Sequence, residues 1–151
     1  MTHFLRFGDV AAILAVIWAL AVVTPLSWWG YVPGEVNVAD APEGTAPPMG
    51  FEAEIRRDIR MSYQVIARAL PGLSVACDAS SNPFTYRRAT QPPKGFDLAW
   101  WAPGDDRCAR LPAGEYTLET CWTARELLAG LLPKKTVCRT SNVFTIRSEA
   151  Q

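Results

Sequence analysis

The sequence has almost no histidine and no closely spaced cysteines. His3 is the single imidazole among 151 residues, and it lies ahead of a long apolar segment. Ser-His and Cys-His catalysis need an imidazole beside the nucleophile, so neither is expected in the rest of the chain. The four cysteines include no Cys-x-x-Cys spacing, which argues against a zinc site or a redox pair. We therefore expect no metal and no other cofactor.

A continuous basic surface is also missing. The chain has 15 Lys and Arg against 15 Asp and Glu, and apolar or acidic segments separate its basic doublets, which are Arg56-Arg57, Arg87-Arg88 and Lys134-Lys135. Nucleic-acid-binding proteins gather such charges into a patch or stripe, so nucleic acid is not an expected partner. Two carboxylate pairs, Glu52/Glu54 and Glu115/Glu119, have the even spacing of one strand face. A solvent-facing strand explains them better than acid-base catalysis, and we do not expect an enzyme.

Charged side chains are absent between Val10 and Gly34. About 20 helical residues cross a hydrocarbon core of about 30 Å, so this run is long enough to do so. It ends in three aromatic residues of the types that prefer the headgroup level, namely Trp28, Trp29 and Tyr31. We predict a cytoplasmic tail over residues 1–9 and a transmembrane helix over residues 10–31, with the lipid bilayer as a partner.

Two interpretations of the apolar run remain open. Small residues mark a signal-peptide cleavage site, but Pro25, Leu26 and two tryptophans follow this apolar core, and the nearest Ala-x-Ala ends at Ala41. A retained anchor therefore fits better than a signal peptide cut near Ala41. Arg6 precedes the run and no Lys or Arg follows it before Arg56, so the positive-inside rule places the N-terminus in the cytoplasm and the remainder in the periplasm or outside the cell.

Proline and glycine are frequent in residues 32–50, which predicts a solvated linker. The domain is expected over residues 51–147, with a short tail over 148–151. This domain holds all four cysteines, which suits an oxidising compartment. Cys121 and Cys138 would oppose each other if the segments around them run antiparallel, which leaves Cys77 to pair with Cys108, although four cysteines allow three pairings.

The domain pattern predicts a mainly β fold. Short alternating runs are separated by Gly, Pro, Asn and Asp turns, at residues 51–55, 59–65, 73–77, 84–86, 96–101, 108–111, 115–123, 136–139 and 143–146. This number of strands in about 100 residues indicates two packed antiparallel sheets. Adjacent residues of a strand face opposite sides, so we expect Trp100 in the core and Trp101 at the surface, as a candidate partner contact.

One short helical insertion is expected after the longest strand. Residues 123–126, Thr-Ala-Arg-Glu, match a capping box, and four leucines follow within six residues. These leucines would cover one end of the core. In a second interpretation they form an exposed apolar tip that contacts a partner through Leu127 and Leu131.

The run from Leu111 to Trp122, Leu-Pro-Ala-Gly-Glu-Tyr-Thr-Leu-Glu-Thr-Cys-Trp, resembles the late strand of immunoglobulin-like β-sandwiches, in which Pro and Gly form a corner that a Tyr anchors. Tyr116 lies five residues before Cys121 rather than two, so the family's intersheet disulfide is not carried over. An N-terminal anchor, a Pro-rich spacer and a final Ser-Asn-x-Phe-Thr-Ile strand are similar to small membrane-anchored proteins among bacteriophage gene products.

The resemblance implies a non-enzymatic binding or structural module with protein partners in a virion or host-envelope complex. A bacterial envelope assembly factor, such as a subunit or chaperone of a secretion, pilus or cell-wall complex, is the alternative. A hydrolase with a carboxylate site comes third.

Overall fold

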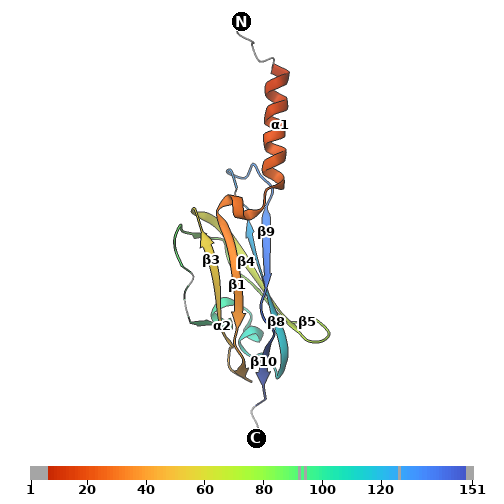
Figure 1. Cartoon of the computed structure of the whole chain (residues 1–151). Helices are drawn as coiled ribbons and strands as arrows, with labels where there is room; N and C mark the ends of the chain where they lie inside the picture. The colour runs from red at the N-terminus through yellow and green to blue at the C-terminus, as the bar shows by residue number, and fades with distance from the viewer. Residues whose placement is uncertain (1–6, 92, 94, 126, 149–151) are drawn as a thin grey trace.

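The computed structural model describes residues 7–91, 93, 95–125 and 127–148. A helix, α1 (Phe7–Val23), projects from one end of an elongated β domain, and the last strand, β10 (Phe144–Arg147), lies at the opposite end (Figure 1). A short 3-10 helix, η1 (Leu26–Trp29), connects α1 to the first strand. His3 and Arg6 lie outside the described residues.

The strands form two sheets. The smaller sheet has the order β1-β3-β7, with β1 (Tyr31–Val38), β3 (Pro48–Ile55) and β7 (Phe96–Asp97). The larger has the order β2-β10-β8-β4-β5, with β2 (Ala41–Pro42), β10 (Phe144–Arg147), β8 (Gly114–Ala124), β4 (Ile59–Ala69) and β5 (Ser74–Ser80). In addition, β6 (Phe84–Tyr86) pairs with β4, and β9 (Lys135–Thr140) pairs with β8. The prediction of a mainly β fold is confirmed.

A cluster of aromatic side chains joins the two sheets. Trp122 of β8 is fully buried, and its ring lies 5.7 Å from that of Tyr31 on β1 and 5.8 Å from that of Phe51 on β3. Tyr116 and Leu118 precede it on the same face of β8 and are also buried, as the alternation predicts. The sheets therefore pack face to face around a shared apolar core.

The expected linker over residues 32–50 is wrong, because this segment belongs to the domain. It forms most of β1, all of β2 and the start of β3, and β1 buries Val36 and Val38. Pro33 fits in a strand because β1 is the edge of its sheet, where a missing N–H costs no ladder hydrogen bond. The domain thus begins about twenty residues before the predicted position 51, at Tyr31.

The expected helix over residues 10–31 is too long at its C-terminal end. The helix ends at Val23, two residues before Pro25, and the chain then enters η1 and β1. Proline has no N–H for the helix and restricts the residue before it to extended conformations. None of the described helices is both long enough and apolar enough to cross a membrane.

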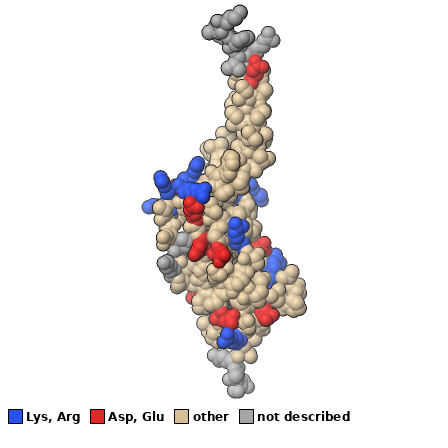
Figure 2. All heavy atoms as spheres, viewed as in Figure 1, with Lys and Arg blue, Asp and Glu red and all other residues tan. Residues whose placement is uncertain are grey.

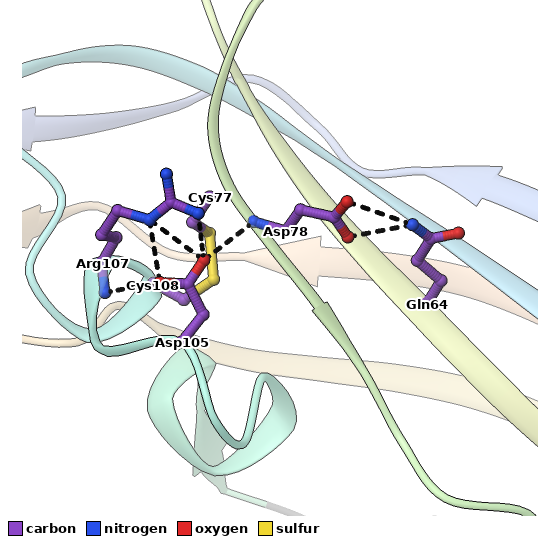
Figure 3. The surroundings of a disulfide bond; sticks show 6 residues. All are labelled: Gln64, Cys77, Asp78, Asp105, Arg107 and Cys108. Carbon is purple, nitrogen blue, oxygen red and sulfur yellow. Dashed lines mark hydrogen bonds and ion pairs between the residues drawn. A yellow bond between two sulfur atoms is a disulfide. The ribbon is translucent and has the colours of Figure 1, made fainter.

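Both disulfides have the predicted pairing. Cys121 of β8 lies directly opposite Cys138 of β9 and is bonded to it. Cys77 of β5 is bonded to Cys108 in a short helix, α3 (Asp106–Ala109), and both sulfurs belong to fully buried residues. Figure 3 shows Asp105 beside this second bridge, where its carboxylate accepts hydrogen bonds from Arg107 and from the N–H of Asp78.

Two predicted strands are helical turns instead. Only Phe96 and Asp97 of the expected strand 96–101 are extended, and Leu98–Trp101 forms α2, because the Asp97 side chain caps the turn by accepting the N–H of Trp100 at 2.8 Å. In the same way Asp105 caps α3, which replaces the strand expected over 108–111.

The predicted helical insertion is also wrong. Thr123, the expected helix cap, is paired with Thr136 of β9 through their hydroxyl groups at 2.9 Å, so β8 continues to Ala124. Residues 127–131 are turns, and Glu126 of the proposed capping box lies outside the described residues.

Candidate functional site

From Val10 to Leu20, every residue of α1 is apolar and exposed, whereas Ala21 and Val22 at the base of the helix are half-buried against the domain. Large apolar side chains of α1 are between 42% and 76% exposed, at Val10, Ile13, Leu14, Val16, Ile17, Trp18, Leu20 and Val23. Residues that follow one another in a helix point in directions about 100° apart, and the alanines between these residues are exposed as well, so the exposed apolar surface covers the whole circumference. A helix that is hydrophobic all round is normally buried, in a large protein or in a membrane.

The base of α1 is attached to the domain by polar contacts. The ammonium of Lys135, at the start of β9, donates to the carbonyl oxygens of Val22 at 2.8 Å and of Thr24. Lys135 is buried, and a cation at a helix C-terminus also interacts favourably with the helix dipole. The indole N–H of Trp29 donates to the Thr24 hydroxyl at 2.9 Å. These contacts hold the orientation of α1 relative to the sheets.

The loop between β8 and β9 lies beside α1. The Trp18 indole N–H donates to the carbonyl of Leu131 at 3.3 Å, and the Leu131 side chain is 74% exposed. Leu128 is exposed as well, whereas Leu127 and Leu132 are buried and cover the end of the core. The expectation that Leu127 contacts a partner is therefore wrong, because its side chain is needed inside, while Leu131 is available at the surface.

Basic side chains gather where α1 meets the domain, and Figure 2 shows them there on the visible face. The Arg56 N–H donates to the carbonyl of Gly30 at 2.8 Å, and the Arg57 side chain lies against Gly30. Gly30 has φ +104°, and a Cβ there would overlap Arg57, so this position requires glycine. We use the term junction surface for Trp28, Leu128, Leu131 and the basic residues Arg56, Arg57 and Lys134.

The three aromatic residues predicted for a membrane interface have different environments. Trp28 is 72% exposed on η1, as an interfacial residue would be, and Trp29 is half-buried. Tyr31 is fully buried, where its ring packs on Tyr86 and Trp122. The interface expectation for Tyr31 is wrong, since it is the first core residue of β1.

The two adjacent tryptophans have the reverse of the predicted exposure. Trp101 is 3% exposed and stacks on Tyr63 with ring centroids 4.1 Å apart, whereas Trp100 is 57% exposed. The strand interpretation placed Trp100 inside, but the capped turn of α2 rotates Trp101 into the core. Trp100, not Trp101, is therefore the indole that a partner could reach.

An apolar cavity opens beside Trp100. It has a volume of about 240 Å³, and its walls include Phe51, Phe84, Tyr86, Trp100 and Trp101. The indole N–H of Trp101 is buried and has no hydrogen-bond partner among the described residues. Burial raises the pKa of Tyr86, so its phenol is neutral at physiological pH. We call this space the aromatic pocket, and its walls suit an apolar side chain. In the sequence, only the alternation around Phe84 and Tyr86 pointed to any part of it.

The one described group of acidic residues and cysteines that lie close together surrounds a disulfide. The Glu119 carboxylate lies within 4.8 Å of Cys121 and Cys138, but these two sulfurs are bonded to each other and are not free thiolates. Glu119 instead pairs with Arg68 at 3.5 Å, and Glu54 pairs with Arg56 at 2.9 Å. The ion pairs agree with the interpretation of these carboxylates as strand-surface residues.

Comparison with known proteins finds no match: no family model, no curated protein and no solved structure is similar to this chain.

Proposed function

We propose that the protein is a non-enzymatic binding module, anchored in a membrane by α1, whose immunoglobulin-like domain lies on the oxidising side. The observation that carries the proposal is an apolar helix, exposed on all sides, that is held firmly on a disulfide-bonded β domain. Burying the side chains of α1 in lipid removes them from water, at about 25 cal/mol for each Å² of apolar surface.

The dimensions of α1 and the composition of the junction surface support an anchor. The 17 residues of α1 rise about 26 Å, close to a hydrocarbon thickness of about 30 Å. With α1 in the bilayer, Trp28 and Leu131 lie at its boundary, where indoles are favoured. Arg56, Arg57 and Lys134 then lie near the lipid phosphates, with which their charges interact favourably.

The strand order supports an immunoglobulin-like sandwich. One sheet of that family contains the A, B and E strands and the other contains the G, F and C strands, and the orders β1-β3-β7 and β10-β8-β4-β5 correspond to A-B-E and G-F-C-C′. The Tyr116 hydroxyl donates to the carbonyl of Pro112 at 2.8 Å, as in the tyrosine corner of that family. The departure is the bridge at Cys121, which joins neighbouring strands of one sheet.

The compartment and the biological setting follow from different arguments. Two disulfides in a domain of this size are typical of a periplasm or cell exterior. The resemblance to phage gene products favours a virion or host-envelope complex as the setting, with a bacterial envelope assembly complex as the alternative. Affinity recovery from membranes of the native host, with and without phage, separates the two by whether virion proteins or envelope subunits are enriched.

Membrane anchoring is tested on the full chain expressed in a bacterium. We expect the wild type in the membrane fraction after a carbonate wash, with its domain accessible to protease added to the periplasm and with no reactive thiol. Leu14→Arg combined with Ile17→Arg should release the chain, because charged residues in hydrocarbon are costly. Val143→Arg, a substitution of another exposed apolar residue far along the domain, is the control. Wild-type protein that washes off the membrane would overturn the proposal.

A further inference from the structure

The described residues leave one edge of the smaller sheet without a strand partner over most of its length. β3 pairs with β7 only at Pro48 and Met49, and its next contact on that side is the Ala89 N–H, which donates to the carbonyl of Ile55 at 3.0 Å. Between these two points, no described residue forms a backbone hydrogen bond with this edge. Apart from this one bond of Ala89, residues 87–91 form no described backbone hydrogen bond with β3, and they run beside it as a loop (Figure 1).

The backbone groups that face this opening can be identified from the alternation of a strand. The carbonyl of Pro48 accepts from Ala39 and the N–H of Arg56 donates to Gly30, so even-numbered residues of β3 point toward β1. Ile55, an odd-numbered residue, accepts from Ala89 on the opposite side. Successive residues of a strand alternate in direction. The N–H and C=O groups of Phe51 and Ala53 therefore face the open edge, which leaves two donors and two acceptors for another strand.

A groove lies along these groups. It has a volume of about 540 Å³ between Gly50–Ala53 on one side and Gln91, Pro93 and Gly95 on the other. Phe51, Gln91 and Pro93 also line the aromatic pocket, so the groove and the pocket adjoin. The described residues of the chain's own loop do not close the edge, and Pro93 among them has no N–H to donate. A strand in the groove would direct alternate side chains inward, toward the pocket and the unpaired Trp101 N–H.

The end of the groove next to Ile55 carries more positive than negative side chains. Arg56 and Arg88 line this end, and Arg87 lines the aromatic pocket. Arg56 is paired with Glu54, and the Asp58 carboxylate accepts the backbone N–H of Arg88 at 2.7 Å. The side chains of Arg87 and Arg88 have no ion-pair partner among the described residues. An acidic group is therefore the complementary charge at this end.

We propose that the edge of β3 binds an extended segment of a partner protein by strand addition. The segment runs antiparallel to β3, hydrogen bonds to Phe51 and Ala53, inserts an apolar side chain into the aromatic pocket and carries an acidic residue at its N-terminal end, next to Arg88. Such recognition takes affinity from main-chain hydrogen bonds and specificity from alternate side-chain pockets. The proposal deepens the binding role proposed above and rests on it, but it does not require membrane anchoring.

The first experiment presents a random decapeptide library to the full chain in detergent micelles. We expect enrichment of peptides in which an acidic residue near the N-terminus is followed by alternating apolar residues. Hydrogen exchange of the complex with the tightest peptide should show new protection at the amides of Phe51 and Ala53, which have no hydrogen-bond partner among the described residues of the free chain. No enrichment, or protection confined to other strands, would overturn the proposal.

Two pairs of variants then test the contacts with that peptide. Ala53→Pro removes the edge N–H without removing a hydrogen bond to β1, and should weaken binding about tenfold or more, whereas Ala53→Ser keeps the amide and should stay within about twofold. Arg88→Gln should weaken binding several-fold, with Arg110→Gln as the exposed control. Equal affinity of the Ala53→Pro and Ala53→Ser variants would contradict strand addition. If Ala53→Pro does not fold, the hydrogen-exchange protection of the Phe51 and Ala53 amides in the wild-type complex tests strand addition instead.

Light scattering of the free chain tests whether a second copy of the chain, rather than a partner protein, fills the groove. A dimer that Ala53→Pro dissociates would show that a second copy fills the groove and would overturn the partner segment. These measurements use micelles and do not depend on membrane anchoring. A failure to bind peptides would therefore overturn the strand-addition proposal alone, and release in the carbonate wash would overturn the membrane anchor alone.

Discussion

The ammonium of Lys135 lies 2.8 Å from the carbonyl oxygen of Val22, which connects the first residue of β9 to the last turn of α1. The same nitrogen reaches the Thr24 carbonyl, so one buried cation satisfies two oxygens at the point where the helix ends. Carbonyl groups at a helix C-terminus have no partner within the helix. Lys135 therefore stabilises the junction between α1 and the domain.

Lys135→Met should loosen this junction, because it leaves both carbonyl groups without their donor. A buried acceptor without a partner costs about 1–3 kcal/mol, so we expect a lower melting temperature and faster hydrogen exchange in residues 24–30. Lys134→Met changes the neighbouring exposed lysine and should have little effect. If the two variants exchange equally slowly in this segment, the Lys135 contact is not what fixes the helix.

The two disulfides should contribute unequally to stability. Loop-entropy reasoning gives about 3 kcal/mol for the separation of 17 residues between Cys121 and Cys138 and about 4 kcal/mol for the separation of 31 residues between Cys77 and Cys108. The second pair is also fully buried, so its replacement by serine leaves hydroxyl groups in the core. Thermal unfolding should therefore show a larger loss for Cys77→Ser with Cys108→Ser than for Cys121→Ser with Cys138→Ser, and the reverse order would contradict this assignment.

The two adjacent tryptophans, Trp100 and Trp101, should contribute very differently to the free energy of unfolding. Trp101→Ala removes a buried ring that stacks on Tyr63 and should cost about 3–5 kcal/mol, which is typical of large aromatic residues in a core. Trp100→Ala removes an exposed ring of the same size and should cost about 1 kcal/mol or less. Chemical denaturation of both variants measures the difference. Similar losses would mean that Trp100 is buried in solution.

These tryptophans also show where sequence reasoning failed. The long alternation of β8 predicted its buried face, because eleven residues with one period leave few alternatives. The run 96–101 is short, and a single local contact, the Asp97 side chain on the Trp100 N–H, favours a helical turn over a strand. Alternation alone does not detect that contact.

The predicted boundaries of the N-terminal helix were wrong for a related reason. Apolar residues from Val10 to Tyr31 look continuous in the sequence, but they belong to two elements, the exposed apolar helix α1 and the core strand β1. Pro25 ends the first, and Tyr31 begins the second. The open edge of β3 could not be predicted at all, because it depends on a strand partner, β7, that is only two residues long.

Because of Asp105, the domain should lose stability as the pH falls below about 4. Its carboxylate accepts the Arg107 guanidinium at 2.8 Å and the Asp78 N–H at 3.1 Å, next to the Cys77–Cys108 bridge. Hydrogen bonds from Arg107, together with those from the backbone, lower the pKa of Asp105 to about 2. An aspartate in an unfolded chain has a pKa of about 3.9. The folded state therefore favours the ionised form, and the resulting stabilisation is present above about pH 4 and is lost as the pH falls toward 2.

Asp105→Asn should consequently lower the melting temperature at pH 7 and have progressively less effect between pH 4 and pH 2, where the wild-type carboxyl group becomes protonated. The measurement is thermal unfolding of both proteins at pH 7, 4, 3 and 2. Asp106→Asn, which removes the adjacent exposed carboxylate, is the matched control and should follow the wild type throughout. A difference between Asp105→Asn and wild type that stays constant down to pH 2 would mean that the charge of Asp105 does not stabilise the fold, and that its contribution comes from hydrogen-bond geometry that asparagine disturbs at every pH.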